Sequence, residues 1–281
     1  MPELPEVETV RRGLLSAMEG KRILHVETRR KDLRFPFPEN FNQRLEGARI
    51  TRLGRRAKYL VGELSNGEAL IMHLGMTGRF TVFGKKPGKF HHAAGEEAKH
   101  DHVVFDMQGG ARVVFNDARR FGFMDLWPLD DIDHYAPFDG MGPEPISNEF
   151  SGAYLKEAFA EKKTPVKSAL LDQYVVAGLG NIYVCEALFR AGISPKKLAG
   201  SIKRDRLEPL AVEIRKVIEE AIEAGGSTIS DFGTPDGELG YFQHRFQVYD
   251  REGEPCITCA KPVKRLVQSG RSTFYCSACQ R

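Results

Sequence analysis

The chain has 281 residues, of which 41% are hydrophobic and 28% charged, and its formal net charge is +3. These proportions are typical of a globular protein, and the length fits two domains with a small appendage. A charge this close to neutral excludes a uniformly basic nucleic-acid-binding protein, so any basic surface must be local. No apolar run approaches the roughly 20 residues of a membrane span, and the first twelve residues do not form a secretory signal. We therefore expect a cytoplasmic protein without membrane contact.

The first part of the chain predicts one helix followed by many short strands. Apolar residues at Val7, Val10, Leu14 and Met18 define one helical face, which ends near Gly20. Alternating runs separated by turn residues then continue to about Trp127 and predict an antiparallel β-sandwich or barrel. The six clearest runs are Arg22–Thr28, Ala48–Leu53, Tyr59–Leu64, Ala69–His73, His102–Asp106 and Arg112–Asn116. The polar stretch 84–99 interrupts them as a loop.

The second part of the chain is predicted to be helical. A proline-rich linker precedes a helix at Tyr154, and Thr164 is expected to cap a helix that has Pro165 at its first position. Asn181 is expected to cap the next helix, and 207–222 forms the longest one. The fold class is therefore α+β: an N-terminal helix and β-sandwich, then a helical domain and a C-terminal hairpin. We divide it into 1–128, a linker 129–147, 148–243 and 244–281.

Four cysteines near the C-terminus predict one structural zinc ion. Cys256 and Cys259 form one C-x2-C pair, Cys276 and Cys279 form another, and sixteen residues separate the pairs. This spacing allows a closed tetrahedral site with a β-hairpin between the pairs. Two disulfides are the alternative, but they suit secreted chains.

The zinc module is also locally basic. From Pro255 to the C-terminus the sequence has no Asp or Glu, and it contains Lys261, Lys264, Arg265, Arg271 and Arg281. Such a hairpin can present an arginine to a phosphate backbone. The alternative is a zinc ribbon that only covers the end of a domain.

The N-terminus contains a possible nucleophile. Removal of Met1 would leave Pro2 as a terminal secondary amine, which is partly uncharged near neutral pH and can attack an aldehyde-level carbon. Glu3 and Glu6 stand close by in sequence and can move protons. An ordinary helix start, with Pro followed by acids, explains the same residues without chemistry.

Several turns carry residues typical of DNA contacts. Lys58 follows two arginines between predicted strands, either as a proton donor or in a solvated basic turn. Met76 and Phe121 lie on glycine-containing turns with Arg119 nearby, a pattern of side chains that enter a base stack, unless both point into the core. His100 and His102 indicate phosphate contact or structural hydrogen bonding.

The segment Gly178-Leu-Gly180-Asn181 lies at the start of a predicted helix. Two glycines allow a phosphate to approach backbone N–H groups there, and Lys162, Lys163 and Lys167 precede it. This favours a helix–turns–helix DNA clamp over a plain helical hairpin.

Taken in order along the chain, these motifs resemble the bacterial formamidopyrimidine-DNA glycosylase family. The motifs are Pro2-Glu-Leu-Pro-Glu-Val-Glu-Thr-Val, Arg55-Arg-Ala-Lys-Tyr, His73-Leu-Gly-Met-Thr-Gly, Asp117-Ala-Arg-Arg-Phe-Gly, Gly180-Asn-Ile-Tyr and Gly270-Arg-Ser-Thr-Phe-Tyr-Cys. The resemblance implies a bifunctional base-excision enzyme that removes oxidised purines, 8-oxoguanine and formamidopyrimidines, and cleaves the strand by β,δ-elimination.

The resemblance also implies roles for individual residues. Pro2 would attack C1′ and form a Schiff base, with Glu3 as acid/base at the sugar. Lys58 and Arg271 would donate protons for β- and δ-elimination. The implied DNA contacts are His73, Met76, His100, Arg119, Phe121, Lys162, Lys167, Asn181, Tyr241 and Arg271. Segment 231–241 would cover the flipped lesion, and Glu186 would approach the active site.

The implied partner is double-stranded DNA with oxidised bases or abasic sites, bound by a monomer that holds one structural Zn²⁺. The sequence departs from the family pattern at Ala118, where proline is frequent, and at Ala260, where glycine is frequent. Two alternatives remain at this stage: an endonuclease VIII-like glycosylase for oxidised pyrimidines, and a non-catalytic protein that binds damaged DNA.

Overall fold

The computed structural model describes residues 1–84, 97–227 and 240–281. They form two compact units, one of Met1–Asp139 with Gly225–Tyr241 and one of Gly140–Ala224 with Phe242–Arg281. The described residues 225–227 and 240–241 thus belong to the first unit, whereas the sequence-based division placed them in the helical domain. None of the helices in the described ranges is both long and apolar enough to span a bilayer.

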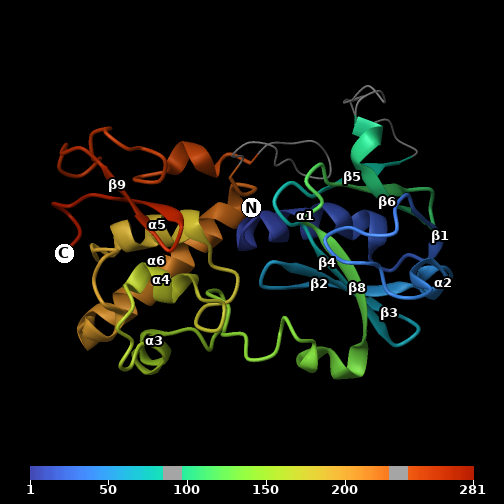
Figure 1. Cartoon of the computed structure of the whole chain (residues 1–281), viewed down its shortest axis with the longest axis horizontal. Helices are drawn as coiled ribbons and strands as arrows, with labels where there is room; N and C mark the ends of the chain where they lie inside the picture. The colour runs from blue at the N-terminus through green and yellow to red at the C-terminus, as the bar shows by residue number, and fades with distance from the viewer. Residues whose placement is uncertain (85–96, 228–239) are drawn as a thin grey trace. The chain divides into compact units, whose positions relative to one another are not determined.

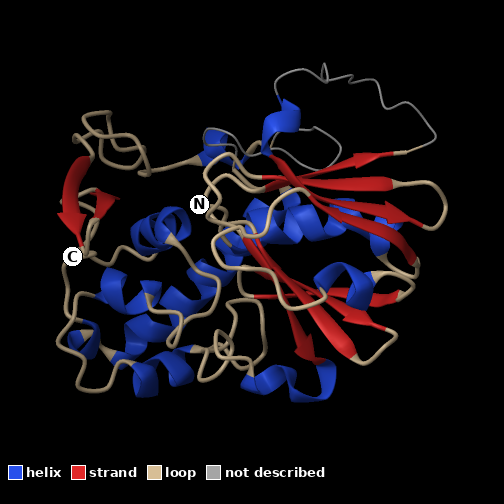
Figure 2. Cartoon of the chain, turned by 45° about the vertical axis from the view of Figure 1, so that its right-hand side comes forward, coloured by secondary structure: helices blue, strands red, loops and turns tan. Residues whose placement is uncertain are grey.

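The first unit is a β-sandwich with a helix packed into it, as predicted (Figure 2). One antiparallel sheet has the order β1 (Ile23–Thr28), β6 (Asp101–Met107), β7 (Arg112–Asn116) and β5 (Arg79–Phe83). The other has the order β2 (Ile50–Arg56), β3 (Tyr59–Leu64), β4 (Glu68–His73) and β8 (Phe123–Pro128). Three short elements complete the unit: α2 (Phe41–Leu45), η1 (Glu97–His100) and η2 (Leu129–His134).

Helix α1 (Leu4–Met18) supplies much of the sandwich core. It packs against β2 and β3 of one sheet and β5 of the other, and Figure 1 shows it among these strands. The predicted apolar face is buried: Val7, Val10, Leu14 and Met18 are at most 1% exposed. Burial of this face fixes the N-terminal end of the helix on the sandwich.

The charged face of α1 is attached to the sandwich through Glu8. Its carboxylate accepts hydrogen bonds from Arg11 (2.9 Å), Arg12 (2.8 Å) and Arg55 of β2 (3.2 Å). Burial alone would raise the pKa of Glu8, but these arginines lower it to about 2. The folded-state pKa lies below the unfolded value, so the stabilisation is present above about pH 4.5 and is lost as the pH falls toward 2.

We therefore expect Glu8→Gln to lower the free energy of unfolding at pH 7 by about 3 kcal/mol, given about 1.4 kcal/mol per pKa unit. Urea unfolding of both proteins at pH 7 and pH 3 measures the effect, which should shrink at the lower pH. The matched control is Glu27→Gln, which removes the half-exposed pair with Arg29 and should cost less than about 1 kcal/mol. Equal losses in both variants would contradict the assignment.

The second unit is helical with a C-terminal hairpin. Its helices are α3 (Gly152–Ala158), α4 (Val166–Leu171), α5 (Asn181–Arg190) and α6 (Arg204–Glu223), with the short turns η3 (Ala199–Ser201) and η4 (Phe242–Arg245). Helix α6 packs against α3 and α5, and α4 packs against α5. The hairpin consists of β9 (Lys264–Gln268) and β10 (Arg271–Tyr275), and β10 contacts α5.

Two predicted helix starts are wrong by one residue. Pro165 is itself the N-cap of α4, because its ψ of 143° is not helical. Gly180 is the N-cap of α5, and Asn181 is the first helical residue. The Asn181 side chain does not cap the helix; its amide donates to the carbonyl of Ser272 at 3.0 Å.

Candidate active site and nucleic-acid interface

The predicted nucleophile lies at the start of α1. Pro2 is partly exposed, and Glu3 is the buried N-cap of the helix. Glu3 and Glu6 form a capping box in which the Glu3 N–H donates to Glu6 Oε2 at 2.8 Å. In the chain that begins with Met1, the Pro2 nitrogen is part of a peptide bond. Removal of Met1 therefore has to precede any amine chemistry at this position.

Glu6 also fixes the position of Ser227. Its Oε1 accepts hydrogen bonds from the backbone N–H (2.9 Å) and the hydroxyl (3.0 Å) of Ser227. Ser227 in turn forms an antiparallel bridge with Tyr241, whose side chain is 65% exposed. These contacts join Ser227, and through it Tyr241 at the end of the predicted lesion-covering loop, to Glu6 in the first turn of α1. Residues 231–239 of that loop lie outside the described residues.

Lys58 and His73 lie near each other in the first unit. Ala57 and Lys58 form the two-residue turn between β2 and β3, with Ala57 at a φ of 51°, and Lys58 is only 7% exposed. Burial, then the charges of Lys58 and Arg34, lower the pKa of His73 to about 4. Its Nδ1 accepts the Gly75 N–H at 3.0 Å, which fixes the neutral ring with its proton on Nε2.

The proposed wedge residues are on the surface and not in the core. Met76 is 38% exposed on the turn between β4 and β5, and Phe121 is 43% exposed on the loop between β7 and β8. The Arg119 guanidinium lies 4.7 Å from the centre of the Phe121 ring. The alternative that both apolar side chains point into the core is therefore wrong.

The remaining predicted contacts divide between the units. His100 is half-buried at the end of η1, where its carbonyl accepts the Asp117 N–H at 3.0 Å. Lys162 is half-buried in the segment before α4 in the second unit. Lys167 differs from the expectation, because it is 0% exposed and its ammonium donates to Ser272 O (3.0 Å) and Thr273 Oγ1 (2.6 Å). Lys167 therefore stabilises the position of the hairpin strand β10.

Arg271 is presented at the tip of the hairpin. Ser269 and Gly270 join the strands with φ angles of 49° and 72°, the positive pair of a tight two-residue hairpin turn. Arg271 follows at once and is exposed. Behind it, the Ser272 carbonyl accepts from both Lys167 and Asn181. Helices α4 and α5 thus fix the direction of the strand that bears Arg271.

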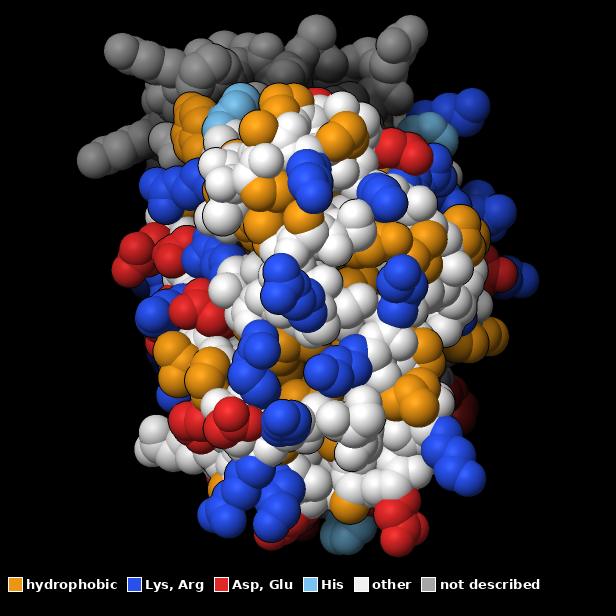
Figure 3. All heavy atoms as spheres, turned by 90° about the vertical axis from the view of Figure 1, so that its left-hand side faces the viewer, with side chains coloured by type: hydrophobic (Ala, Val, Ile, Leu, Met, Phe, Trp, Pro, Cys, Tyr) orange, Lys and Arg blue, Asp and Glu red, His pale blue; other side chains and the backbone are white. Residues whose placement is uncertain are grey.

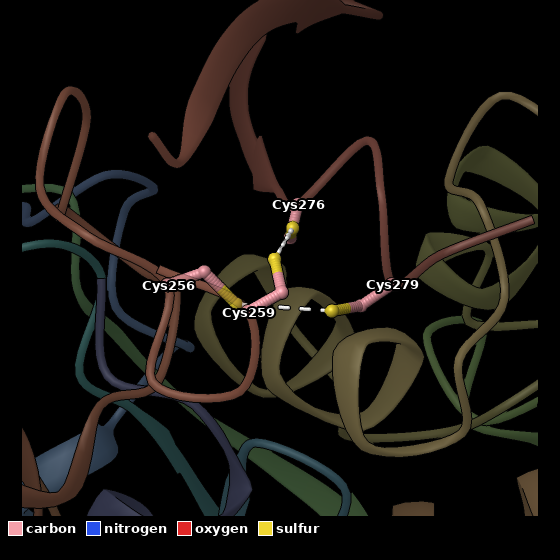
Figure 4. A group of neighbouring side chains, drawn as sticks. All are labelled: Cys256, Cys259, Cys276 and Cys279. Atoms are coloured by element: carbon pink, nitrogen blue, oxygen red, sulfur yellow. Dashed lines mark hydrogen bonds between the residues drawn. The ribbon is translucent and has the colours of Figure 1, made fainter. Parts of the chain in front are cut away.

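The four predicted ligands form a zinc site (Figure 4). Their sulfur atoms all lie within 4.8 Å of one another, with Cys256–Cys279 at 3.9 Å and Cys259–Cys276 at 3.5 Å. Tetrahedral Zn–S bonds of about 2.3 Å require S–S distances of about 3.8 Å, so the residues fit one Zn²⁺. Disulfide bonds, at about 2 Å, do not fit these distances. Ala260, after the second ligand, adopts the left-handed φ of 57° that favours the glycine frequent in the family.

The protonation of the four thiols also favours a bound cation. Against the effect of burial, the backbone N–H groups of Cys279 and Ala278 lower the pKa of Cys276 to about 7. Burial and the neighbouring sulfurs raise the pKa of Cys279 to about 12. Four thiolates cannot coexist here without a positive ion, and Zn²⁺ supplies the charge that allows all four to deprotonate.

Glu186 has a structural role within the second unit. It is 0% exposed on α5, and its carboxylate accepts the backbone N–H groups of Gln247, Val248 and Tyr249 at 2.8–3.0 Å. Burial raises the pKa of Glu186, and these three donors oppose that rise. The carboxylate ties the chain entering the zinc module to the helical core.

Basic side chains are spread over the face that carries the hairpin. Figure 3 shows Lys and Arg across the middle of this face, with Asp and Glu mostly near its edges. Exposed basic residues of the second unit include Lys196, Lys203, Arg204, Lys261, Lys264, Arg265, Arg271 and Arg281. The chain therefore has a basic surface that is local, as its near-neutral net charge led us to expect.

Sequence reasoning missed two residues that organise the site, Asp117 and Ser227. Asp117 is fully buried and joins two surface turns, and Ser227 connects Glu6 to Tyr241. An aspartate at the start of a turn, followed by Gly122, was the available signal for the first. Nothing in the local sequence pairs Ser227 with Glu6, because 221 positions separate them.

Pro2 before a capped N-terminal helix, a β-sandwich, a helical unit and a four-cysteine zinc hairpin together are the features of a class of DNA repair glycosylases. Three family models match: the formamidopyrimidine-DNA glycosylase N-terminal domain over residues 1–124, the H2TH domain of the same enzymes over 141–233, and the zinc finger found in FPG and IleRS over 253–281. The formamidopyrimidine-DNA glycosylase of Dinoroseobacter shibae is 59% identical over 284 residues, covering 100% of both chains. The chain therefore belongs to the formamidopyrimidine-DNA glycosylase family.

Solved structures agree with this assignment. A Lactococcus lactis FPG mutant bound to Fapy-dG-containing DNA is 32% identical, with a TM-score of 0.88 and 100% of both chains covered. A MutM in complex with DNA containing carbocyclic 8-oxo-G is 33% identical, with a TM-score of 0.86 and the same coverage.

Proposed function

We propose that this protein is a bifunctional DNA glycosylase and AP lyase of base excision repair. It removes oxidised purines, 8-oxoguanine and formamidopyrimidines, from double-stranded DNA and then cleaves the strand. The full-length likeness to a formamidopyrimidine-DNA glycosylase carries this proposal, because 59% identity extends over all of both chains. Relatives bound to Fapy-dG and 8-oxo-G DNA support the lesion class.

In the proposed reaction, the Pro2 nitrogen of the processed chain attacks C1′ of the flipped nucleotide. The C1′–N bond to the base breaks, and the base leaves with its electron pair and a proton. Opening of the sugar ring gives an iminium between Pro2 and C1′, with Glu3 exchanging protons at the sugar oxygen. The buried position of Glu3 at the helix N-cap supports this role, since it holds the carboxyl group beside the nucleophile.

Strand cleavage follows from the iminium, which acidifies the adjacent carbon. β-Elimination expels the 3′ phosphate and δ-elimination expels the 5′ phosphate. We assign proton donation in these steps to Lys58 and Arg271, respectively. The buried turn that holds Lys58 and the braced hairpin tip that holds Arg271 support the assignment, because both restrict the position of a long side chain.

Met76, Arg119 and Phe121 are proposed to occupy the space left by the extruded base. Contacts with the sugar-phosphate backbone of the DNA are assigned to His100, Lys162, Asn181, Tyr241 and Arg271. His73 joins them as a neutral donor, because its pKa near 4 leaves the ring uncharged at neutral pH. Lys167 acts on DNA only through the hairpin that it holds. We further propose that the protein works as a monomer in the bacterial cytoplasm.

Lesion preference tests this function. We expect excision of 8-oxoguanine opposite cytosine to be at least about 10-fold faster than excision of thymine glycol from a matched duplex. Competition between the two labelled duplexes measures the ratio. The 8-oxoguanine strand should end in phosphates on both sides of the gap, as β,δ-elimination requires. A preference for thymine glycol would instead indicate a pyrimidine-specific enzyme.

A further inference from the structure

Two surface turns that carry the proposed space-filling residues meet at one buried carboxylate. Asp117 is 0% exposed, and its Oδ1 lies 2.6 Å from the Thr77 hydroxyl, beside Met76. The same oxygen accepts the Arg119 N–H at 3.2 Å, and Oδ2 accepts the Gly122 N–H at 2.7 Å. Thr77 Oγ1 also accepts from the Arg119 N–H, at 3.2 Å. The Thr77 hydroxyl therefore bonds to two groups of the opposite turn, the Asp117 carboxylate as donor and the Arg119 N–H as acceptor.

The backbones of the two turns are in direct contact, and glycines make this possible. A Cβ on Gly75, which has a φ of 65°, would stand 2.3 Å from the Gly122 nitrogen and the Phe121 carbonyl carbon. A Cβ on Gly122 would stand 2.8 Å from the His73 carbonyl oxygen. Such distances are far inside van der Waals contact, so neither turn can move alone without opening this junction.

The main chain of Asp117 extends the junction to a third element. Its N–H donates to the His100 carbonyl at 3.0 Å, and its own carbonyl accepts His102 Nε2–H at 2.9 Å. Asp117 thus bonds to the turn of Met76, to the loop of Arg119 and Phe121, and to the segment of His100. All three carry residues assigned above to DNA.

We propose that Thr77 and Asp117 are positioning residues that lock the two turns into a single rigid wedge. The inference rests on the proposed function, since it concerns the void left by an extruded base. A buried carboxylate is costly unless donors satisfy it, and the Thr77 hydroxyl is the donor from the opposite turn. Locked turns insert Met76 and the Arg119–Phe121 pair together. Separate turns would each lose conformational entropy at that step.

The test removes only the hydroxyl that spans the turns. Thr77→Val keeps the β-branched shape, and we expect it to slow single-turnover excision of 8-oxoguanine from duplex DNA about 10-fold. Thr77→Ser restores the hydroxyl and should stay within about twofold of the original chain. Thr77→Ala is a second hydroxyl-free variant, in case valine disturbs folding. Thr51→Val is the matched control, because it removes an exposed strand hydroxyl that donates to Glu63 O at 3.1 Å.

A second measurement separates positioning from a general defect. Cleavage of a preformed abasic site in single-stranded DNA needs no base to leave a stack, so Thr77→Val should leave it unchanged within about twofold. In a double-mutant cycle with Met76→Ala, the two effects should be markedly less than additive. Normal duplex excision by both hydroxyl-free variants, equal loss on both substrates, or full additivity would each overturn the inference. An original chain inactive on both substrates would instead refute the proposed function.

Discussion

An N-terminal tag that blocks removal of Met1 is expected to abolish borohydride trapping of the protein on DNA containing an abasic site. The tag keeps the Pro2 nitrogen in a peptide bond, where its lone pair is delocalised and cannot form an iminium. Loss of the covalent nucleophile should lower both trapping and base excision by at least about 10³-fold. Gel electrophoresis of the reduced adduct measures trapping, and single-turnover assays measure excision.

The same tag at the C-terminus is the matched control, since Arg281 is exposed and lies outside the proposed chemistry. The control should trap at the level of the untagged chain. Pro2→Gly is a companion variant that replaces the secondary terminal amine with a primary one and loses the fixed proline ring. It should trap far less than the untagged chain, because glycine does not hold the amine in one direction beside Glu3. Undiminished trapping by the N-terminally tagged protein, with its mass intact, would refute the prolyl mechanism.

The parts of this site that the sequence predicted are those with local signals. The zinc ligands follow from two C-x2-C pairs, and the buried face of α1 follows from the spacing of Val7, Val10 and Leu14. Strands β5 and β8 were not among the six predicted runs. Strand β5 lies between a turn and a polar stretch, and β8 ends in Pro128, so neither shows a clear alternating pattern with turns on both sides.

The parts that the sequence did not reveal depend on contacts distant along the chain. Lys167 reads as a surface cation near the start of a helix, yet its ammonium binds a strand more than a hundred residues away. Glu186 was expected to approach the active site, yet its carboxylate accepts backbone donors 61 to 63 positions later. Burial of a charged side chain requires partners that no local pattern specifies. The four-part domain division stays a prediction.

Loss of the zinc ion is expected to remove DNA binding while the helices remain folded. Cys276→Ser takes one ligand from the site and exchanges a thiolate for a poor zinc ligand. Without the metal, β9 and β10 lose the link between their outer ends, and the exposed cations of the hairpin no longer have fixed positions. Because phosphate contacts dominate affinity, we expect the Kd for lesion-bearing duplex to rise at least about 100-fold.

Fluorescence anisotropy at two salt concentrations measures the rise in Kd and shows whether lost phosphate contacts cause it. The dependence of log Kd on log salt should become shallower in Cys276→Ser, since fewer phosphate contacts release fewer counterions. Far-ultraviolet circular dichroism should show the helical signal nearly unchanged, because the helices pack on one another, α6 against α3 and α5 and α4 against α5.

Cys185→Ala is the matched control for this prediction. Cys185 is buried against the same apolar cluster as Cys256 and Cys276 but is not one of the four clustered ligands. It should bind DNA like the original chain, with only a modest loss of stability. If Cys276→Ser bound DNA with the original affinity and salt dependence, the hairpin could not be the element that holds the phosphate backbone. Arg271 would then have to reach the lesion although the zinc ion no longer fixed the position of strand β10.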